Sequence, residues 1–131
     1  MRRAAYLTLS AAATGAVIAL MCCGPSRAAS APPELVAVAH EVAQLPDGPG
    51  GHGHDCIWRT SLVLARLRGY DAHRQDVSWA SRYHTDCHEV ASVWLGEDEW
   101  LVDGQTGMVV RAEGEWAGPF HIDNCAQAMG R

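Results

Sequence analysis

Two apolar runs joined by a short polar segment, CHEVASVWLGEDEWLVD at residues 87–103, decide the fold of this chain. His88–Leu95 is rich in β-branched and aromatic residues and predicts a strand, Gly96–Glu99 predicts a turn, and Trp100–Asp103 predicts a second strand. An antiparallel hairpin follows from this order. Tyr70–Trp79 before it and Met108–Arg111 after it also look extended, so the pattern indicates an antiparallel meander.

Two helices are expected ahead of this sheet. Glu34–Leu45 and Asp55–Arg68 both carry apolar residues at helical spacing. In the second of them Arg59 and Arg66 are expected to point away from the core. The last stretch, Glu113–Arg131, shows little periodicity. The order predicts an α+β fold in which N-terminal helices pack on a small antiparallel sheet.

The N-terminus has the pattern of a secretory signal peptide. Arg2 and Arg3 precede an apolar run over Ala11–Met21, and small residues follow. The run is shorter than the roughly 20 residues that span a bilayer, and the residues before Cys22 and Cys23 lack the small side chain usual before a lipidated cysteine. We therefore expect a signal peptide over residues 1–31, cleaved near 29–31, and a single exported domain over residues 32–131, periplasmic or secreted.

Charge narrows the class of partner. The whole chain has 10 basic and 15 acidic side chains, and three of the basic ones lie in the expected signal peptide. The remaining domain keeps seven arginines against fifteen acids, a charge near −8. A domain this acidic repels phosphate backbones, so nucleic acid is not an expected partner. Stable membrane insertion is not expected after cleavage either.

Three cysteines remain in the expected domain, namely Cys56, Cys87 and Cys125. An odd count leaves one thiol over. If Cys87 pairs with Cys125, the disulfide ties the C-terminal tail to the sheet and Cys56 is the free thiol. A free cysteine is more often a small buried side chain than a nucleophile, so the count by itself assigns no chemistry.

Position gives Cys56 more meaning than the count does. With Asp55 as N-cap, Cys56 lies in the first turn of a helix, where unpaired N–H groups favour a thiolate. His88 opens a strand 32 residues later and is the type of side chain that exchanges protons near neutral pH. Asp103 follows 15 residues after His88 across the hairpin and can orient an imidazole, with an offset in strand register. Nucleophile, base and orienting acid form a complete set.

The flanking residues resemble the transglutaminase-like core of the papain-like fold. Three segments carry the likeness: GHDC at 53–56 with LVLARLRGYDA at 62–72, then HEVASVW at 88–94, then WLVD at 100–103. In that superfamily, which includes bacterial cysteine peptidases, the nucleophilic cysteine heads a helix and the histidine and aspartate follow on strands. The resemblance implies that Cys56 is the nucleophile, His88 the general base and acid, and Asp103 the orienting residue. It implies a thiol hydrolase or acyltransferase acting on a peptide or protein amide.

Some features of the family pattern are missing. The glutamine that papain-type enzymes place before the cysteine is absent, so only the Cys56 backbone N–H and, as a weak second donor, His54 are candidates for stabilising an oxyanion. Trp79 is a candidate for lining a substrate cleft. Some bacterial relatives bind calcium through acids that flank the nucleophile; Asp55 fits this pattern and Ile57 does not, so no cofactor is expected.

Two other functions are compatible with the residues. The histidines and cysteines of two segments are possible zinc or copper ligands: His52, His54 and Cys56 in the first, and His84, Asp86, Cys87 and His88 in the second. No standard zinc spacing is met, and a metal site does not explain why Cys56 heads a helix. A catalytically inactive transglutaminase-like binding module is the other alternative, because the domain is small for a peptidase with its own groove.

Overall fold

The computed structural model describes residues 29–49, 55–79, 87–123 and 125. The expected signal peptide lies almost entirely outside these residues, so the structure does not describe it. Two helices and six strands follow one another in this order: α1 (Pro33–Ala43), α2 (Asp55–Arg66), β1 (Asp71–Trp79), β2 (Cys87–Leu95), β3 (Asp98–Val102), β4 (Val109–Arg111), β5 (Trp116–Ala117) and β6 (Phe120–Ile122).

Both predicted helices are present, and their ends have local causes. Pro33 stands in the first turn of α1, where a missing N–H costs nothing. Helix α2 begins at Asp55, so Cys56 lies in its first turn as predicted. The chain leaves α2 through Gly69, whose φ of 98° is a backbone conformation that favours glycine. That residue turns the chain directly into β1.

The predicted meander is also present, and it forms four of the six strands. The strand order in the sheet is β4-β3-β2-β1-β6-β5, and every described pairing is antiparallel. The β2–β3 turn is tighter than predicted, because β3 begins at Asp98 and pairs it with Leu95. Gly96, with φ of 65°, and Glu97 alone form the two-residue connection.

Apolar side chains cover both faces of the sheet. One face packs against α1 and α2 in a cluster whose fully or almost fully buried members are Leu35, Ala39, Val42, Val63, Leu67, Ala91, Val93, Trp100 and Val102. The opposite face carries a second cluster, made by the strands alone, of Val77, Val90, Leu101, Ala117 and Phe120. Successive strand residues therefore alternate between two cores.

The expected fold, N-terminal helices packed on a small antiparallel sheet, is wrong. The domain is dominated by its sheet, which curls into a nearly closed barrel accompanied by two helices. The segment that changes the fold is the C-terminal one, because β6 pairs with the free edge of β1 and β5 pairs with β6. The two edge strands then approach each other: a Cβ on Gly118, beside β5, would lie 2.9 Å from Val110 Cγ1 of β4.

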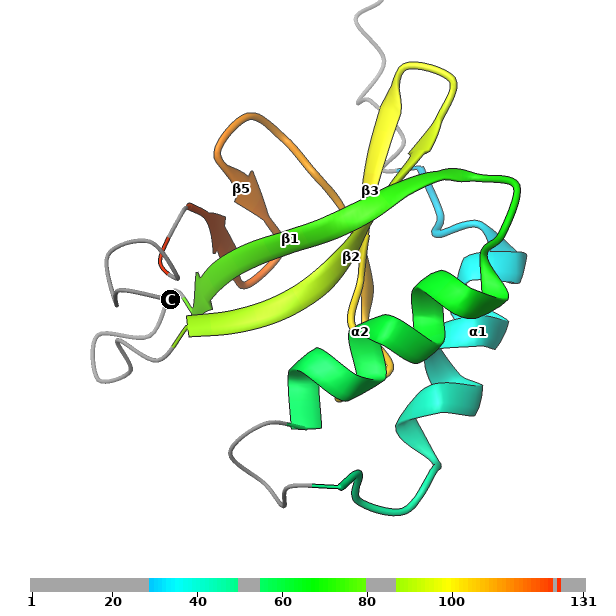
Figure 1. Ribbon diagram of the computed structural model, residues 1–131. Helices are drawn as coiled ribbons and strands as arrows, with labels where there is room; N and C mark the ends of the chain where they lie inside the picture. The colour runs from blue at the N-terminus through cyan, green and yellow to red at the C-terminus, as the bar shows by residue number, and fades with distance from the viewer. Residues whose placement is uncertain (1–28, 50–54, 80–86, 124, 126–131) are drawn as a thin grey trace, which may run out of the picture.

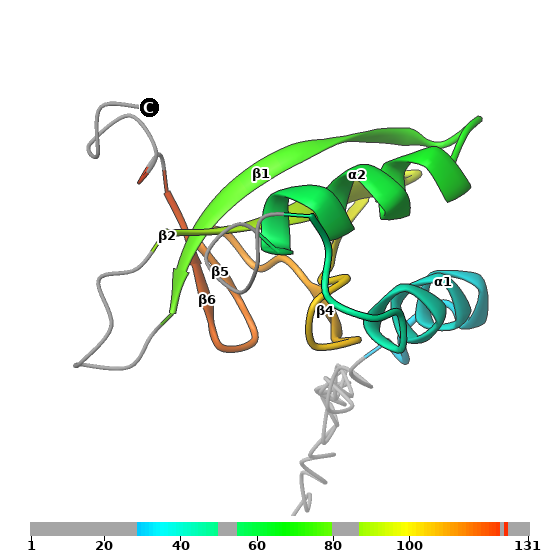
Figure 2. The ribbon, with the colours of Figure 1, turned by 60° about the horizontal axis from the view of Figure 1, so that its bottom comes forward.

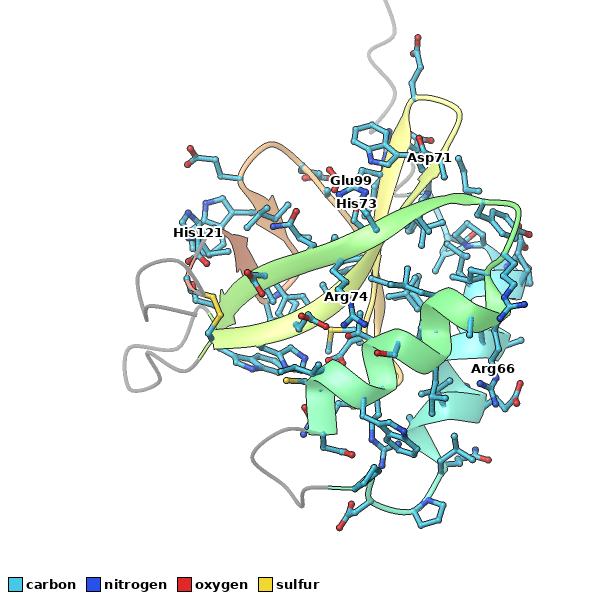
Figure 3. The ribbon with its side chains drawn as sticks, in the orientation of Figure 1. Arg66, Asp71, His73, Arg74, Glu99 and His121 are labelled. Carbon is cyan, nitrogen blue, oxygen red and sulfur yellow. A yellow bond between two sulfur atoms is a disulfide. The ribbon has the colours of Figure 1, made fainter. Side chains whose placement is uncertain are left out.

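The two helices and the C-terminal strands lie on opposite sides of the long strands β1 and β2, as Figure 1 shows. Figure 2, turned by 60°, shows α2 running along the sheet with α1 beside it, and β5 and β6 on the far side. Arg74 of β1, labelled in Figure 3, links sheet and helix by donating to Ser61 Oγ at 2.6 Å and Ile57 O at 3.4 Å. Helix α2 is thus held along the sheet, with its first turn near the start of β2.

Candidate active site

Cys56 lies half-buried in the first turn of α2 and is the free cysteine among the residues that the structure describes. Burial of its thiol raises the pKa, but hydrogen bonds from the His88 ring and the Glu89 backbone outweigh burial and bring the pKa below its ordinary value. The positive charge of His88 acts in the same direction. Cys56 therefore favours the thiolate, which is the nucleophilic form.

Helix α2 meets β2 at Glu89. The pairing between β2 and β3 stops at Ala91 and Val102, so β3 does not extend along the first residues of β2. Thr60, which is fully buried, donates from Oγ1 to the Glu89 carbonyl at 2.9 Å. The backbone of Glu89 also forms a hydrogen bond with Cys56, which lies one turn before Thr60 in the helix. These contacts fix the first turn of α2 against the strand that carries His88.

His88 is the second residue of β2 and is only 6 % exposed. Burial alone would lower its pKa, but Asp103 and Cys56, through hydrogen bonding and charge, raise the pKa to about 9. Nε2 lies 3.0 Å from Asp103 Oδ2, so the ring and the carboxylate form a close ion pair. The other ring nitrogen, Nδ1, is then the one left for the thiol.

Aromatic side chains surround the imidazole of His88. The ring of Phe120 in β6 stacks on it with centroids 5.9 Å apart, and the ring of Trp79 at the end of β1 lies 5.7 Å away. Trp79 and Phe120 also contact each other, with ring centroids 4.8 Å apart. Their faces are electron-rich, so they are compatible with a protonated imidazole. Trp79 was predicted to line a cleft; the structure places it against His88, and Phe120 was not predicted at all.

Asp103 directly follows β3 and is 1 % exposed. Its Oδ1 accepts from the Gln105 backbone N–H at 2.8 Å and its Oδ2 from Thr106 Oγ1 at 2.7 Å. Burial raises the Asp103 pKa, but His88 and these two donors more than compensate and hold it below its usual range. A carboxylate held in this way stays ionised and fixes one side of the ring. Gln105 and Thr106 were missed, although an aspartate followed by a glycine and a threonine is typical of such side-chain turns.

Strand register explains how His88 and Asp103 meet. Because Ala91 pairs with Val102, Asp103 stands across from Val90, two residues along from His88. Residues two apart on a strand share a face, so both side chains lie on the face of the second core. The connection between the strands has two residues, yet it does not set His88 directly opposite Asp103, and the two positions are offset by two residues.

Arg59 does not point outward, as the helical pattern had predicted, but is 4 % exposed. It pairs with the equally buried carboxylate of Asp55. It also donates to the backbone carbonyls of Leu45 at 2.9 Å and Pro46 at 3.4 Å. Helical periodicity assigns a charged residue at this position to solvent, but here the backbone carbonyls just past the end of α1 give Arg59 buried partners.

The metal-site alternative loses one of its ligands. Cys87 forms a disulfide with Cys125, the pairing considered from the cysteine count, and cannot serve as a thiolate ligand. No group of three metal-binding side chains occurs within the described ranges. His52, His54, His84 and Asp86 lie outside those ranges, so neither the metal role of this set nor the oxyanion role of His54 has a structural account. Asp55, the candidate calcium ligand, is paired with Arg59.

Comparison with known proteins adds no family. The chain matches no protein-family model, no curated protein and no solved structure. The resemblance to transglutaminase-like enzymes therefore rests on the residues themselves. In the part of the chain that the structure describes, no helix is both long and apolar enough to cross a membrane. The disulfide and this finding are compatible with export.

Proposed function

We propose that this chain is an exported thiol enzyme, similar to transglutaminase-like peptidases and acyltransferases, that cleaves or transfers an acyl group through a covalent intermediate on Cys56. The observation that carries the proposal is the placement of His88 between two partners. It contacts the thiol of Cys56 on one side and the buried carboxylate of Asp103 on the other. This is the relation of nucleophile, base and orienting acid that acyl transfer requires.

The electrostatics favour a thiolate on Cys56 and an imidazolium on His88. The Cys56 pKa lies below its ordinary value and the His88 pKa rises to about 9. The sulfur therefore loses its proton at a lower pH than an ordinary thiol does. The His88 ring keeps its proton to a higher pH than an ordinary imidazole, so that proton is available to a leaving group.

In the first half-reaction the Cys56 sulfur forms a bond to the carbonyl carbon of an amide or thioester. The carbonyl oxygen gains negative charge, and the Cys56 backbone N–H, which has no partner within the helix, is the donor for it. The bond to the leaving group then breaks, and that group takes the proton from His88. Asp103 keeps the ring oriented throughout.

In the second half-reaction neutral His88 takes a proton from water or from an amine. The deprotonated oxygen or nitrogen attacks the thioester carbon, and the carbon–sulfur bond breaks. The acid or the new amide leaves, and the thiolate and imidazolium are restored. Water gives hydrolysis and an amine gives acyl transfer, so the nature of the acceptor separates a peptidase from a crosslinking enzyme.

Alkylation with iodoacetamide across pH tests the thiolate. We expect modification at Cys56 with a midpoint well below the value of about 8.5 that is ordinary for a thiol. His88→Gln should move the midpoint up toward that value, and Arg66→Ala, an exposed change at the other end of the same helix, should leave it in place. An ordinary midpoint in the unchanged protein would refute the mechanism.

Acyl transfer is tested with p-nitrophenyl acetate, an activated ester. A rapid release of nitrophenolate with one acetyl group on Cys56, followed by slow turnover, is expected of an acyl-enzyme. Cys56→Ser should abolish the acetyl adduct at that position. A depressed thiol pKa without acetylation would instead favour the inactive binding module.

A further inference from the structure

A second buried ionic group lies beside the nucleophile. Arg59 follows Cys56 by three residues in α2, and Asp55 precedes Cys56 directly. The two side chains pair with each other although each residue is only 4 % exposed. Neither takes part in the chemistry proposed above, so their burial needs another reason.

The guanidinium of Arg59 joins α2 to the end of α1. Its Nη1 donates to Val42 O, and its Nη2 donates to Leu45 O at 2.9 Å and Pro46 O at 3.4 Å. Leu45 and Pro46 lie just past the end of α1, and Val42 O also accepts from the Leu45 N–H at 3.1 Å. A planar group with five donors can serve several such carbonyls at once. Asp55 binds the segment after α1 as well, because its Oδ1 accepts from the Gly48 N–H at 3.0 Å.

The stem of Arg59 packs on the loop that holds Asp103. Gly104 follows Asp103, and a Cβ on Gly104 would lie 3.2 Å from Arg59 Cβ. The same atom would lie 2.9 Å from Val63 Cγ2 and 3.0 Å from Val42 Cγ1. The backbone beside Asp103 is thus pressed against the side chains of α2 and α1, and one of those side chains is Arg59.

We propose that Arg59 is a positioning residue that sets the first turn of α2, and with it Cys56, against the loop that carries Asp103. The inference rests on the proposed function. Arg59 pairs with Asp55, the neighbour of Cys56, and packs beside Gly104, the neighbour of Asp103, while its charge is met by Asp55 and, at 3.9 Å, by Asp47. The groups that move the Cys56 pKa are His88 and Glu89, besides burial. Arg59 therefore acts on the thiol through geometry.

The test compares Arg59→Lys and Arg59→Met with Arg66→Ala. A lysine keeps a positive charge for Asp55 but has one nitrogen and cannot serve the three carbonyls together. Arg66, labelled in Figure 3 near the other end of α2, also bridges the two helices, through Nε to Glu41 Oε1 at 2.9 Å, on the exposed side. It is the matched control for a helix-to-helix link that is distant from Cys56. Thermal unfolding and the pH profile of Cys56 alkylation by iodoacetamide are measured for each variant.

We expect Arg59→Lys to raise the midpoint of alkylation by about one pH unit and so to slow alkylation near pH 6 by about tenfold, since only the thiolate reacts. Arg66→Ala should keep the profile of the unchanged protein to within about twofold. Arg59→Met is expected to show a larger effect, and if it does not fold, the lysine variant decides. An Arg59→Lys profile that coincides with that of the unchanged protein, even with a lower unfolding temperature, overturns the inference.

The failure of the proposed function would look different. In that case the unchanged protein itself would show an ordinary thiol midpoint, and there would be no activated thiol for Arg59 to position. A low midpoint in the unchanged protein that survives in both Arg59 variants refutes only the positioning role.

Discussion

Replacement of Asp103 by asparagine tests the link between fold stability and the proposed chemistry most directly. Asparagine has nearly the same shape and can still accept from the Gln105 N–H, which Asp103 now binds at 2.8 Å. It cannot provide the negative charge that lies 3.0 Å from His88 Nε2. The variant therefore removes the charge from the pair while most of the turn is preserved.

The size of the effect follows from the His88 pKa. Burial lowers it, and the hydrogen bonds and charges of Asp103 and Cys56 raise it from 6.5 to about 9. At about 1.4 kcal/mol for each tenfold change in proton affinity, the rise corresponds to about 3 kcal/mol of folding free energy. A small domain has only about 5 to 15 kcal/mol in total, so the change is measurable.

The pH dependence gives the prediction its sign. The folded-state pKa of His88 lies above its unfolded value, so the folded protein binds the proton more tightly. This stabilisation is complete below about pH 6.5 and is lost as the pH rises through about 9. Loss of the buried Asp103 charge by itself changes the free energy of unfolding equally at both ends of that pH range, because the depressed pKa keeps the Asp103 carboxylate ionised throughout.

Denaturant unfolding of the unchanged protein and of Asp103→Asn, at about pH 6 and about pH 10, measures the difference. The destabilisation should be larger at the lower pH by roughly 2 to 3 kcal/mol. In a His88→Gln background the same substitution should show no such pH dependence. Equal destabilisation at both pH values in the unchanged background would refute the coupling between His88 and Asp103.

Three further predictions concern the surroundings of the site. Cys125→Ser removes the disulfide to Cys87, which joins residues 38 apart in the sequence. It should lower the free energy of unfolding by about 4 kcal/mol under oxidising conditions and have little effect in dithiothreitol; an equal loss of stability in both conditions would contradict the prediction. Gly104→Ala places a Cβ within 3.0 Å of neighbouring side chains and, because Gly104 does not have a positive φ, should cost about 1 to 3 kcal/mol in denaturant unfolding through crowding alone; unchanged stability would contradict it. Thr60→Val leaves the Glu89 carbonyl without its donor and should cost about 1 to 2 kcal/mol and slow Cys56 alkylation; an unchanged alkylation rate would separate that hydrogen bond from the site.

The sequence predicted the elements whose patterns are long enough to show a period. The helices beginning at residues 33 and 55 and the hairpin of β2 and β3 fall within a few residues of the predicted bounds. Strands β5 and β6 have two and three residues, too few to show alternation, and they were missed. That omission is why the sheet was expected to be small, since β6 is the strand that extends the sheet past β1.

The site was predictable to the extent that its members are reactive residue types at element ends. Cys56 and His88 are each the second residue of an element and Asp103 directly follows one. The hairpin brings His88 and Asp103 together, and the packing of α2 on β2 adds Cys56. The partners that set their charge states were not predictable. Phe120 comes from a strand that was not predicted. Arg59 was assigned to solvent because helical periodicity contains no information on the backbone carbonyls that its guanidinium binds.

The nearly closed barrel matters to the proposed chemistry because it surrounds His88 with apolar groups. A sheet covered by helices on one side only would leave the face of Val90 and His88 in water, where an imidazole has an ordinary pKa. Phe120 and Trp79 close that face, and burial by itself would then favour the neutral ring. The buried carboxylate of Asp103 reverses this preference, so the protonated ring is stabilised by one strongly held charge rather than by solvent. The short C-terminal strands and the turn after β3 are therefore required together: the strands exclude water from the ring, and the turn supplies the charge that keeps the ring protonated.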